Sequence, residues 1–255
     1  MKWLFALAFL TLPVRAATTD EIFAIYARGD YEAAAKAGEA AHTADGLAIA
    51  ARAVLGDAVL RDTPCMECLQ RAERLARASV AADSRNAYGQ VWLAVSLGYQ
   101  ARLLGIVKAK LRDMPAQSRA ALDAALADDA KNAYAVSALG GWHIEAVKGG
   151  GAFLARAIYG ARESEALALF DRAVKLAPGN VAVHYQVALA LLGFDGEKYR
   201  ARILTELHAA AGGTAATAYE KAIQTRANDL LGLINHGPED VLARRLRRYQ
   251  GFAED

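Results

Sequence analysis

The sequence predicts an all-α fold built from repeated pairs of packed helices. Only five of the 255 residues are proline, and alternating β-branched segments are scarce, as is typical of helical proteins. In residues 165–180, apolar side chains recur at every third or fourth position and so line one side of a helix. Burying such a stripe is worth about 25 cal/mol per Å², so each helix needs a neighbour. The third observation is one helix boundary that recurs along the chain.

Residues 1–16 are predicted to be a signal peptide. Lys2 is followed by an apolar run as far as Pro13, and Val14-Arg15-Ala16 fits the small-x-small pattern of a cleavage site. The run is shorter than the about 20 residues that a membrane-spanning helix needs. We therefore expect cleavage after Ala16 or Ala17 and a periplasmic or secreted protein. The alternative is a retained membrane anchor or a buried first helix.

The charge balance argues against a nucleic-acid partner. The chain has 30 Lys and Arg against 28 Asp and Glu, and removal of residues 1–16 would take away Lys2 and Arg15 and leave 28 of each. A nucleic-acid-binding protein needs a surplus of cations to displace the counterions of the phosphates. The mature chain is formally neutral, so we expect no such partner.

The repeated helix boundary is clearest at Pro178-Gly179-Asn180. Proline cannot continue the helix of residues 165–177, glycine can adopt a positive φ, and asparagine can cap the helix of residues 181–194. The same arrangement recurs at Asn86 and Asn132, so that the three asparagines lie 46 and 48 residues apart. Helix pairs repeated in this way form a stacked array in which each pair covers its neighbour.

These residues resemble the tetratricopeptide repeat (TPR) family. Its second helix carries small, aromatic and small residues and then proline, at spacings that Ala166, Phe170, Ala173 and Pro178 match. Its first helix carries a large apolar residue followed by a small one, as Leu93-Ala94, Leu139-Gly140 and Val187-Ala188 do, and its turn between helices is similar to Gly29–Ala34. The resemblance implies a TPR-like superhelical array of antiparallel helix pairs in residues 17–255, with the clearest repeats at about 64–211.

Two insertions and a helical cap are expected around this array. The family period is 34 residues, so the spacings imply insertions of 12 and 14 residues at about 102–116 and 148–162. They should form extended or extra helices that protrude on one rim, the second starting at a glycine hinge, Lys148–Gly151. This layout is also similar to exported bacterial TPR proteins associated with transporters, and to the regulator of microtubule dynamics family. C-terminal helices are expected at about 214–250, the last one a solvated cap that carries Arg244, Arg245, Arg247 and Arg248.

The two cysteines, Cys65 and Cys68, form the most specific chemical motif. With Thr63 as N-cap and Pro64 at the first helical position, both thiols are expected in the first turn of a helix. Cα atoms three residues apart are close enough for a disulfide, and an exported protein meets an oxidising compartment. A structural disulfide is favoured. A redox-active pair and a zinc site remain alternatives, although the thioredoxin-like βαβ pattern is missing and one pair supplies two of four zinc ligands.

The sequence contains no motif that predicts an enzyme, a metal site or a cofactor. The five histidines lack a metal-ligand spacing, and His143, close to Glu145, is expected to be a packed, hydrogen-bonded histidine. Lys148–Gly151 lacks the strand and the Lys-Ser/Thr pair of a phosphate-binding loop.

The TPR resemblance implies a binding protein with a concave groove. In the family, the second, fifth and ninth positions of the first helices line this groove. The matching positions, with the adjoining Trp142 and His143, are Tyr88, Val91, Val95, Tyr134, Ser137, Gly141, Ala182, Tyr185 and Leu189. The lysine and asparagine with which some members hold a peptide's C-terminal carboxylate are missing from these positions.

An aromatic and apolar groove suits a protein partner, bound in the groove or at the inserted rim. The alternative function is a periplasmic carrier of a lipid-like small molecule or metabolite, associated with a transporter. A thiol oxidoreductase that uses Cys65 and Cys68 is a third possibility. The insertions and C-terminal helices could instead fill the groove, and its side chains would then be ordinary core.

Overall fold

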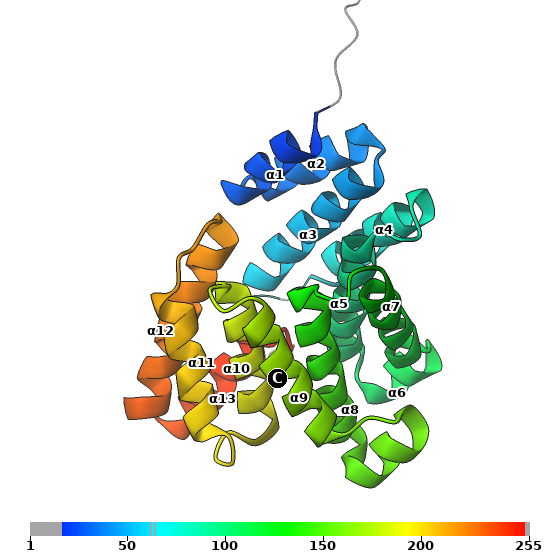
Figure 1. The fold of residues 1–255 in the computed structure, drawn as a ribbon. Helices are drawn as coiled ribbons and strands as arrows, with labels where there is room; N and C mark the ends of the chain where they lie inside the picture. Colours follow the sequence, from blue (N-terminus) through cyan, green and yellow to red (C-terminus); the bar gives the residue numbers. More distant parts are fainter. Residues whose placement is uncertain (1–16, 62, 64, 253–255) are drawn as a thin grey trace, which may run out of the picture.

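The computed structural model describes residues 17–61, 63 and 65–252, so the predicted signal peptide lies outside the described residues. The described part contains thirteen α-helices and no β-strand, which confirms the predicted all-α class (Figure 1). None of these helices is both long enough and apolar enough to cross a membrane. The helices are α1 (Thr19–Ala27), α2 (Tyr31–Ala41), α3 (Ala44–Leu60), α4 (Met66–Ala82), α5 (Ala87–Leu104), α6 (Ile106–Leu111), α7 (Met114–Asp128), α8 (Ala133–Tyr159), α9 (Glu163–Leu176), α10 (Val181–Asp195), α11 (Arg200–Gly212), α12 (Ala218–His236) and α13 (Glu239–Tyr249).

Successive helices pack side by side along the chain, and the row of helices curves until its ends meet. Helices α2 to α5 contact one another in order, as do α7 to α12, and both α1 and α3 contact α12 (Figure 1). At one of these contacts, a Cβ atom on Gly29 would lie 2.9 Å from the Cβ of Ala218. Gly29 also has φ +93°, so glycine meets both the backbone and the packing requirement. We call the contact of α1 and α3 with α12 the ring closure.

The predicted asparagine caps are confirmed at three helix starts. The side-chain oxygens of Asn86, Asn132 and Asn180 accept hydrogen bonds from the backbone N–H groups three residues on, at 2.7, 3.1 and 3.0 Å. Each bond satisfies one of the N–H groups that a helix start leaves without a partner, and such a cap is worth about 1 kcal/mol. The sequence therefore places the starts of α5, α8 and α10 through local chemistry.

A small residue opposite an aromatic ring brings two helices together, as the repeat pattern predicts. A Cβ atom on Gly140 of α8 would lie 2.6 Å from Cε1 of Phe170 on α9. Phe170 is 2% exposed, and Ala166 and Ala173, one turn away on either side, are fully buried. The ring of Phe170 thus occupies the space that a side chain at position 140 would need.

The two insertions form one extra helix and one extended helix. Gly105, with φ +77°, separates α5 from the short helix α6, and α8 continues as far as Tyr159. The predicted hinge corresponds to a kink: the backbone is helical through Gly150 and leaves helical geometry at Gly151, with φ +73°. Both insertions expose large apolar side chains, among them Leu111 and Phe153, each 82% exposed.

The last helix differs from the expected solvated cap. The Arg245 guanidinium contacts the Asp229 carboxylate of α12 at 2.6 Å, and the Tyr249 hydroxyl donates to the same carboxylate at 2.8 Å. Beyond the helix, the Gln250 side chain is 3% exposed and donates to the Leu189 carbonyl of α10. The basic face thus contributes an arginine to the interface with α12, and α13 is anchored at its C-terminal end.

Candidate functional site

The described helices border a partly open cavity of about 710 Å³. Its walls come from α3, α5, α7, α8 and α10. Tyr26 of α1, α6, Tyr219 of α12 and the segment after α13 complete them. Ligand pockets in proteins usually measure about 300–1,000 Å³ and have mostly apolar walls with a few polar groups. The cavity fits both descriptions, so it is the candidate functional site.

Two helices supply the long walls of the cavity. On α5, Val91, Val95 and Gly98 line the cavity at helical spacing, and on α8 the lining extends from Tyr134 to Tyr159, on both sides of the kink. These residues lie on one face of each helix because side chains three and four positions apart share a face. The opposite faces of α5 and α8 pack on their neighbours α4 and α9.

Most of the predicted groove residues line this cavity. They are Val91, Val95, Tyr134, Ser137, Gly141, Trp142, Ala182 and Leu189. Four of them come from α8, and Trp142 is fixed there by a 2.9 Å hydrogen bond from its indole nitrogen to the Pro115 carbonyl. That bond ties α8 to the start of α7, next to the first insertion.

Three predicted groove residues lie elsewhere. Tyr88 is half exposed and stacks on Trp92, with ring centroids 6.4 Å apart. Tyr185 is buried in the core shared by α10, α11 and α12, and this burial raises the pKa of its hydroxyl. His143 is buried beside α9. His143 points from another face of α8 than the lining residues do. Tyr88 and Tyr185 share the helical spacing of lining residues, so the repeat spacing did not show that they lie outside the cavity.

His143 is a packed, hydrogen-bonded histidine, as predicted. It is 5% exposed, and its Nδ1 accepts a hydrogen bond from the Arg162 N–H at 3.1 Å. Burial lowers its pKa, and the nearby charge of Arg119 lowers it further. Because an accepting Nδ1 carries no proton, this histidine is held neutral and joins α8 to the start of α9.

One end of the cavity contains a cation among four aromatic rings. The guanidinium carbon of Arg52 lies 4.7 Å from the ring centroid of Tyr26, 5.4 Å from those of Trp92 and Tyr134, and 5.6 Å from that of Phe23. Arg52 also donates a long hydrogen bond of 3.4 Å to the Tyr134 hydroxyl. Rings at these distances stabilise the cation through their electron-rich faces.

The charge of Arg52 is maintained in this apolar setting. Burial by itself lowers the pKa of Arg52, but the Coulombic effects of Tyr26 and Tyr134, a hydrogen bond with Tyr26 and the charge of Glu220 together raise the pKa above its ordinary value. Within the described residues, no carboxylate lies within ion-pair distance of this guanidinium. Arg102, the other arginine that lines the cavity, has the Glu145 carboxylate at 2.9 Å and the Gln250 carbonyl at 3.0 Å.

The other end of the cavity opens at the two insertions. Ile106 of α6 and Leu154 and Ile158 of α8 both line the cavity and have half or more of their surface exposed. Lys110 and Lys148 line the same end. The cavity thus has an aromatic end with an arginine and an open end bordered by apolar side chains and lysines.

Sequence reasoning missed Arg52 and the residues that close the cavity. Arg52 lies outside the repeats that carried the family resemblance, and Tyr219, Gln250 and Phe252 come from the C-terminal helices or beyond. One signal was available: Arg52 is a single cation in the apolar run of residues 46–56. A charge at the centre of an apolar helix requires a special environment.

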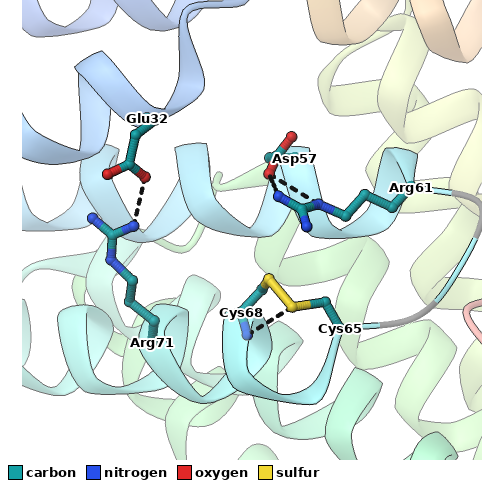
Figure 2. The surroundings of a disulfide bond; sticks show 6 residues. All are labelled: Glu32, Asp57, Arg61, Cys65, Cys68 and Arg71. Atoms are coloured by element: carbon teal, nitrogen blue, oxygen red, sulfur yellow. Dashed lines mark hydrogen bonds and ion pairs between the residues drawn. A yellow bond between two sulfur atoms is a disulfide. The ribbon is translucent and has the colours of Figure 1, made fainter.

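The cysteine pair forms a disulfide, as favoured from the sequence (Figure 2). The helix start differs from the prediction: α4 begins at Met66, and Cys65, not Thr63, is the N-cap. The Cys65 sulfur accepts a hydrogen bond from the Cys68 N–H at 3.2 Å, so it takes the capping role that the Thr63 hydroxyl was expected to fill. Pro64 lies outside the described residues.

Ion pairs tie the helices around the disulfide together. Arg71 of α4 contacts the carboxylates of Glu32 at 2.6 Å and Glu39 at 2.9 Å, both on α2, and Asp57 contacts Arg61 on the neighbouring α3 (Figure 2). The space between these groups measures only about 70 Å³. The disulfide therefore lies in a packed and ion-paired region, away from the large cavity.

In the part of the chain that the structure describes, no group of three or more His, Cys, Asp or Glu side chains is placed to hold a metal ion. Comparison with known proteins adds no identity: no family model matches this chain, and no curated protein matches its sequence.

Proposed function

We propose that this chain binds an elongated, largely apolar small molecule in the cavity and acts as a carrier, not as an enzyme. The observation that supports this most directly is the cavity of about 710 Å³ between α5 and α8, with mainly apolar walls and an open end at the insertions. Transfer of apolar surface from water into such a site provides the binding free energy. Each buried methylene group is worth about 0.8 kcal/mol, about a fourfold change in Kd.

The two tryptophans outside residues 1–16, Trp92 and Trp142, both line the cavity and provide an internal probe. We expect alkyl chains that carry a bromine atom to quench the tryptophan fluorescence with saturation. Kd should fall about fourfold for each added methylene until the cavity is full. Quenching that rises linearly with concentration, without saturation, would contradict the proposal.

Two glycine substitutions make a matched pair for this measurement. Gly141 lines the cavity and has open space at the position of its missing Cβ, so Gly141→Leu should fill the cavity without a clash. Gly232 of α12 also has open space but is exposed and lies outside the cavity. Both changes improve helix propensity. We expect Gly141→Leu to weaken binding at least tenfold and Gly232→Leu to leave it unchanged.

The proposal includes an exported protein with a TPR-like superhelical array. The matches to the TPR pattern, the asparagine caps and the packing of Phe170 on Gly140 support the array. A periplasmic carrier could deliver its ligand to a transporter in the membrane. Mass spectrometry of the protein from its native host would test export, because the mature chain should then begin at Ala17 or Thr18.

Protein binding at the inserted rim is a second candidate function. Two exposed apolar pairs favour it, Val107 with Leu111 on α6 and Phe153 with Leu154 on α8. Exposed apolar side chains that are grouped in this way are typical of interaction sites. Crosslinking from position 153 in the periplasm should then capture one defined protein, and Leu111→Lys should abolish the product. An unchanged product in the variant would contradict this candidate.

A further inference from the structure

The aromatic end of the cavity has the chemistry of a site for an anion. The Arg52 guanidinium lies in an apolar cavity, and within the described residues no carboxylate forms an ion pair with it. Arg52 is only partly buried, and removing even part of a cation's hydration is costly unless an opposite charge or hydrogen bonds compensate. The four aromatic rings compensate in part, and an anion would complete the compensation.

The carboxylate that acts electrostatically on Arg52 is already engaged. Glu220 of α12 contributes to the raised pKa of Arg52 by its Coulombic effect. Its carboxylate, however, accepts hydrogen bonds from the backbone N–H groups of Ala216 at 2.8 Å and Thr217 at 3.0 Å. These bonds belong to the capping box that starts α12. Glu220 therefore stabilises a helix start and does not pair with Arg52.

A hydroxyl beside Arg52 can donate a second hydrogen bond to an anion. The Tyr134 oxygen accepts one hydrogen bond from Arg52 at 3.4 Å and another from the Asn180 side chain at 3.1 Å. A phenol that accepts two hydrogen bonds still has its own proton to donate. The guanidinium of Arg52 and the hydroxyl of Tyr134 together thus offer N–H and O–H donors at one place on the cavity wall.

We propose that the cavity binds an amphiphile with a carboxylate head group, held by Arg52 and Tyr134, while its apolar chain extends between α5 and α8 toward the insertions. This inference rests on the proposed carrier function and names its ligand class. A carboxylate is favoured because one guanidinium presents paired N–H donors that match two carboxylate oxygens. A phosphate with two charges would need further cations beside Arg52. The two lysines that line the cavity, Lys110 and Lys148, lie at its open end instead.

The test compares ligands of equal chain length and different head group. Dodecanoate, dodecanol and dodecyl sulfonate are titrated at neutral pH into the mature chain, and binding is followed by calorimetry. We expect dodecanoate to bind at least tenfold more tightly than dodecanol, because its charged head group forms stronger hydrogen bonds with Arg52 and Tyr134 than a hydroxyl does. Dodecyl sulfonate should fall between the two. Tighter binding of the sulfonate than of the carboxylate would overturn the assignment of a carboxylate.

Arg52→Met should remove the preference for dodecanoate and leave the affinity for dodecanol within about twofold, which also shows that the variant is folded. Arg52→Lys should keep part of the preference. Arg119→Met is the matched control, because Arg119 lies 5.2 Å from the Trp142 ring but does not line the cavity. Equal binding of dodecanoate and dodecanol to the unmodified chain would overturn the inference and leave the carrier function standing. Binding of neither ligand would overturn both.

Discussion

Arg226 of α12 donates a hydrogen bond of 3.0 Å to the carbonyl oxygen of Leu60 at the end of α3. The two residues are 166 positions apart in the chain, so this bond joins the C-terminal helices to the N-terminal ones at the ring closure. Arg226 is 7% exposed, and its guanidinium carbon lies 4.5 Å from the Tyr249 ring centroid. The contact thus links α3, α12 and the end of α13 through one side chain.

Removal of this contact should destabilise the fold. We expect Arg226→Ala to lower the free energy of unfolding by about 2–3 kcal/mol, because the partly buried Leu60 carbonyl loses a charged donor and the Tyr249 ring loses its cation. Urea unfolding followed by circular dichroism measures the change. Arg244→Ala is the control, since Arg244 forms an exposed ion pair with Asp240 within α13. Its loss should lower the free energy of unfolding by less than about 0.5 kcal/mol. Equal losses in the two variants would contradict the role of the ring closure.

His184 should stabilise the fold most at acidic pH. Its Nδ1 lies 2.5 Å from the Glu206 carboxylate and its Nε2 lies 2.9 Å from the Pro178 carbonyl. Both partners are acceptors, so the ring is doubly protonated. The hydrogen bond to Glu206 is the main cause of its raised pKa. The contribution is complete below the unfolded-state pKa of about 6.5 and is lost as pH rises through the folded-state pKa. The stability difference between the unmodified chain and His184→Gln should shrink with rising pH.

The opposite dependence is expected for His143, whose pKa is lowered by burial. A lowered pKa means that the stabilising contribution is present above the unfolded-state pKa of about 6.5 and is lost as pH falls through the folded-state value. The stability difference between the unmodified chain and His143→Gln should therefore grow between about pH 5 and pH 8. Thermal unfolding scans across this range measure both histidines. Parallel curves for His143→Gln and His184→Gln would contradict the assignment of opposite protonation states.

The disulfide should make a modest contribution to stability and none to ligand binding. Closure of so short a loop is worth about 2 kcal/mol at most, and the bond lies in the ion-paired region between α2, α3 and α4. We expect the double substitution Cys65→Ser with Cys68→Ala to lower the free energy of unfolding by about 1–2 kcal/mol, because serine keeps an N-cap acceptor. Affinity for alkyl ligands should be unchanged. Catalysed reduction of a test disulfide by the unmodified chain would instead support a redox role for the pair.

Addition of one methyl group at Gly140 should be costly. The new Cβ would lie 2.6 Å from the Phe170 ring, and overpacking of this kind costs about 1–3 kcal/mol. Gly232→Ala is the matched control, because open space surrounds that position, and the better helix propensity of alanine should stabilise the chain by up to about 1 kcal/mol. The two variants should therefore differ in the sign of their effect on the unfolding midpoint. If Gly140→Ala instead stabilised the chain, it would contradict the close contact between Gly140 and the Phe170 ring.

The sequence by itself determined the local features of this protein. A helix cap, a glycine opposite an aromatic ring and a disulfide between neighbours depend on residues a few positions apart or on a short repeat, so Asn180, Gly140 and Cys65 could be interpreted without the fold. Val91 and Gly141, which the repeat spacing selected, line the cavity, and so does Trp142, which adjoins Gly141. Tyr185, selected by the same spacing, lies in the core, because the spacing shows which residues share a face but not which neighbour that face meets.

Only the tertiary structure decided that the helices border a cavity with an arginine at its aromatic end. Tyr26, Arg52, Trp92 and Tyr134 come from α1, α3, α5 and α8, and no local pattern relates them. These side chains surround Arg52 because α3 packs on α1 and α5, and α5 packs on α8. Such contacts between distant helices depend on the whole chain, because many weaker packing contacts must first bring the helices to their positions.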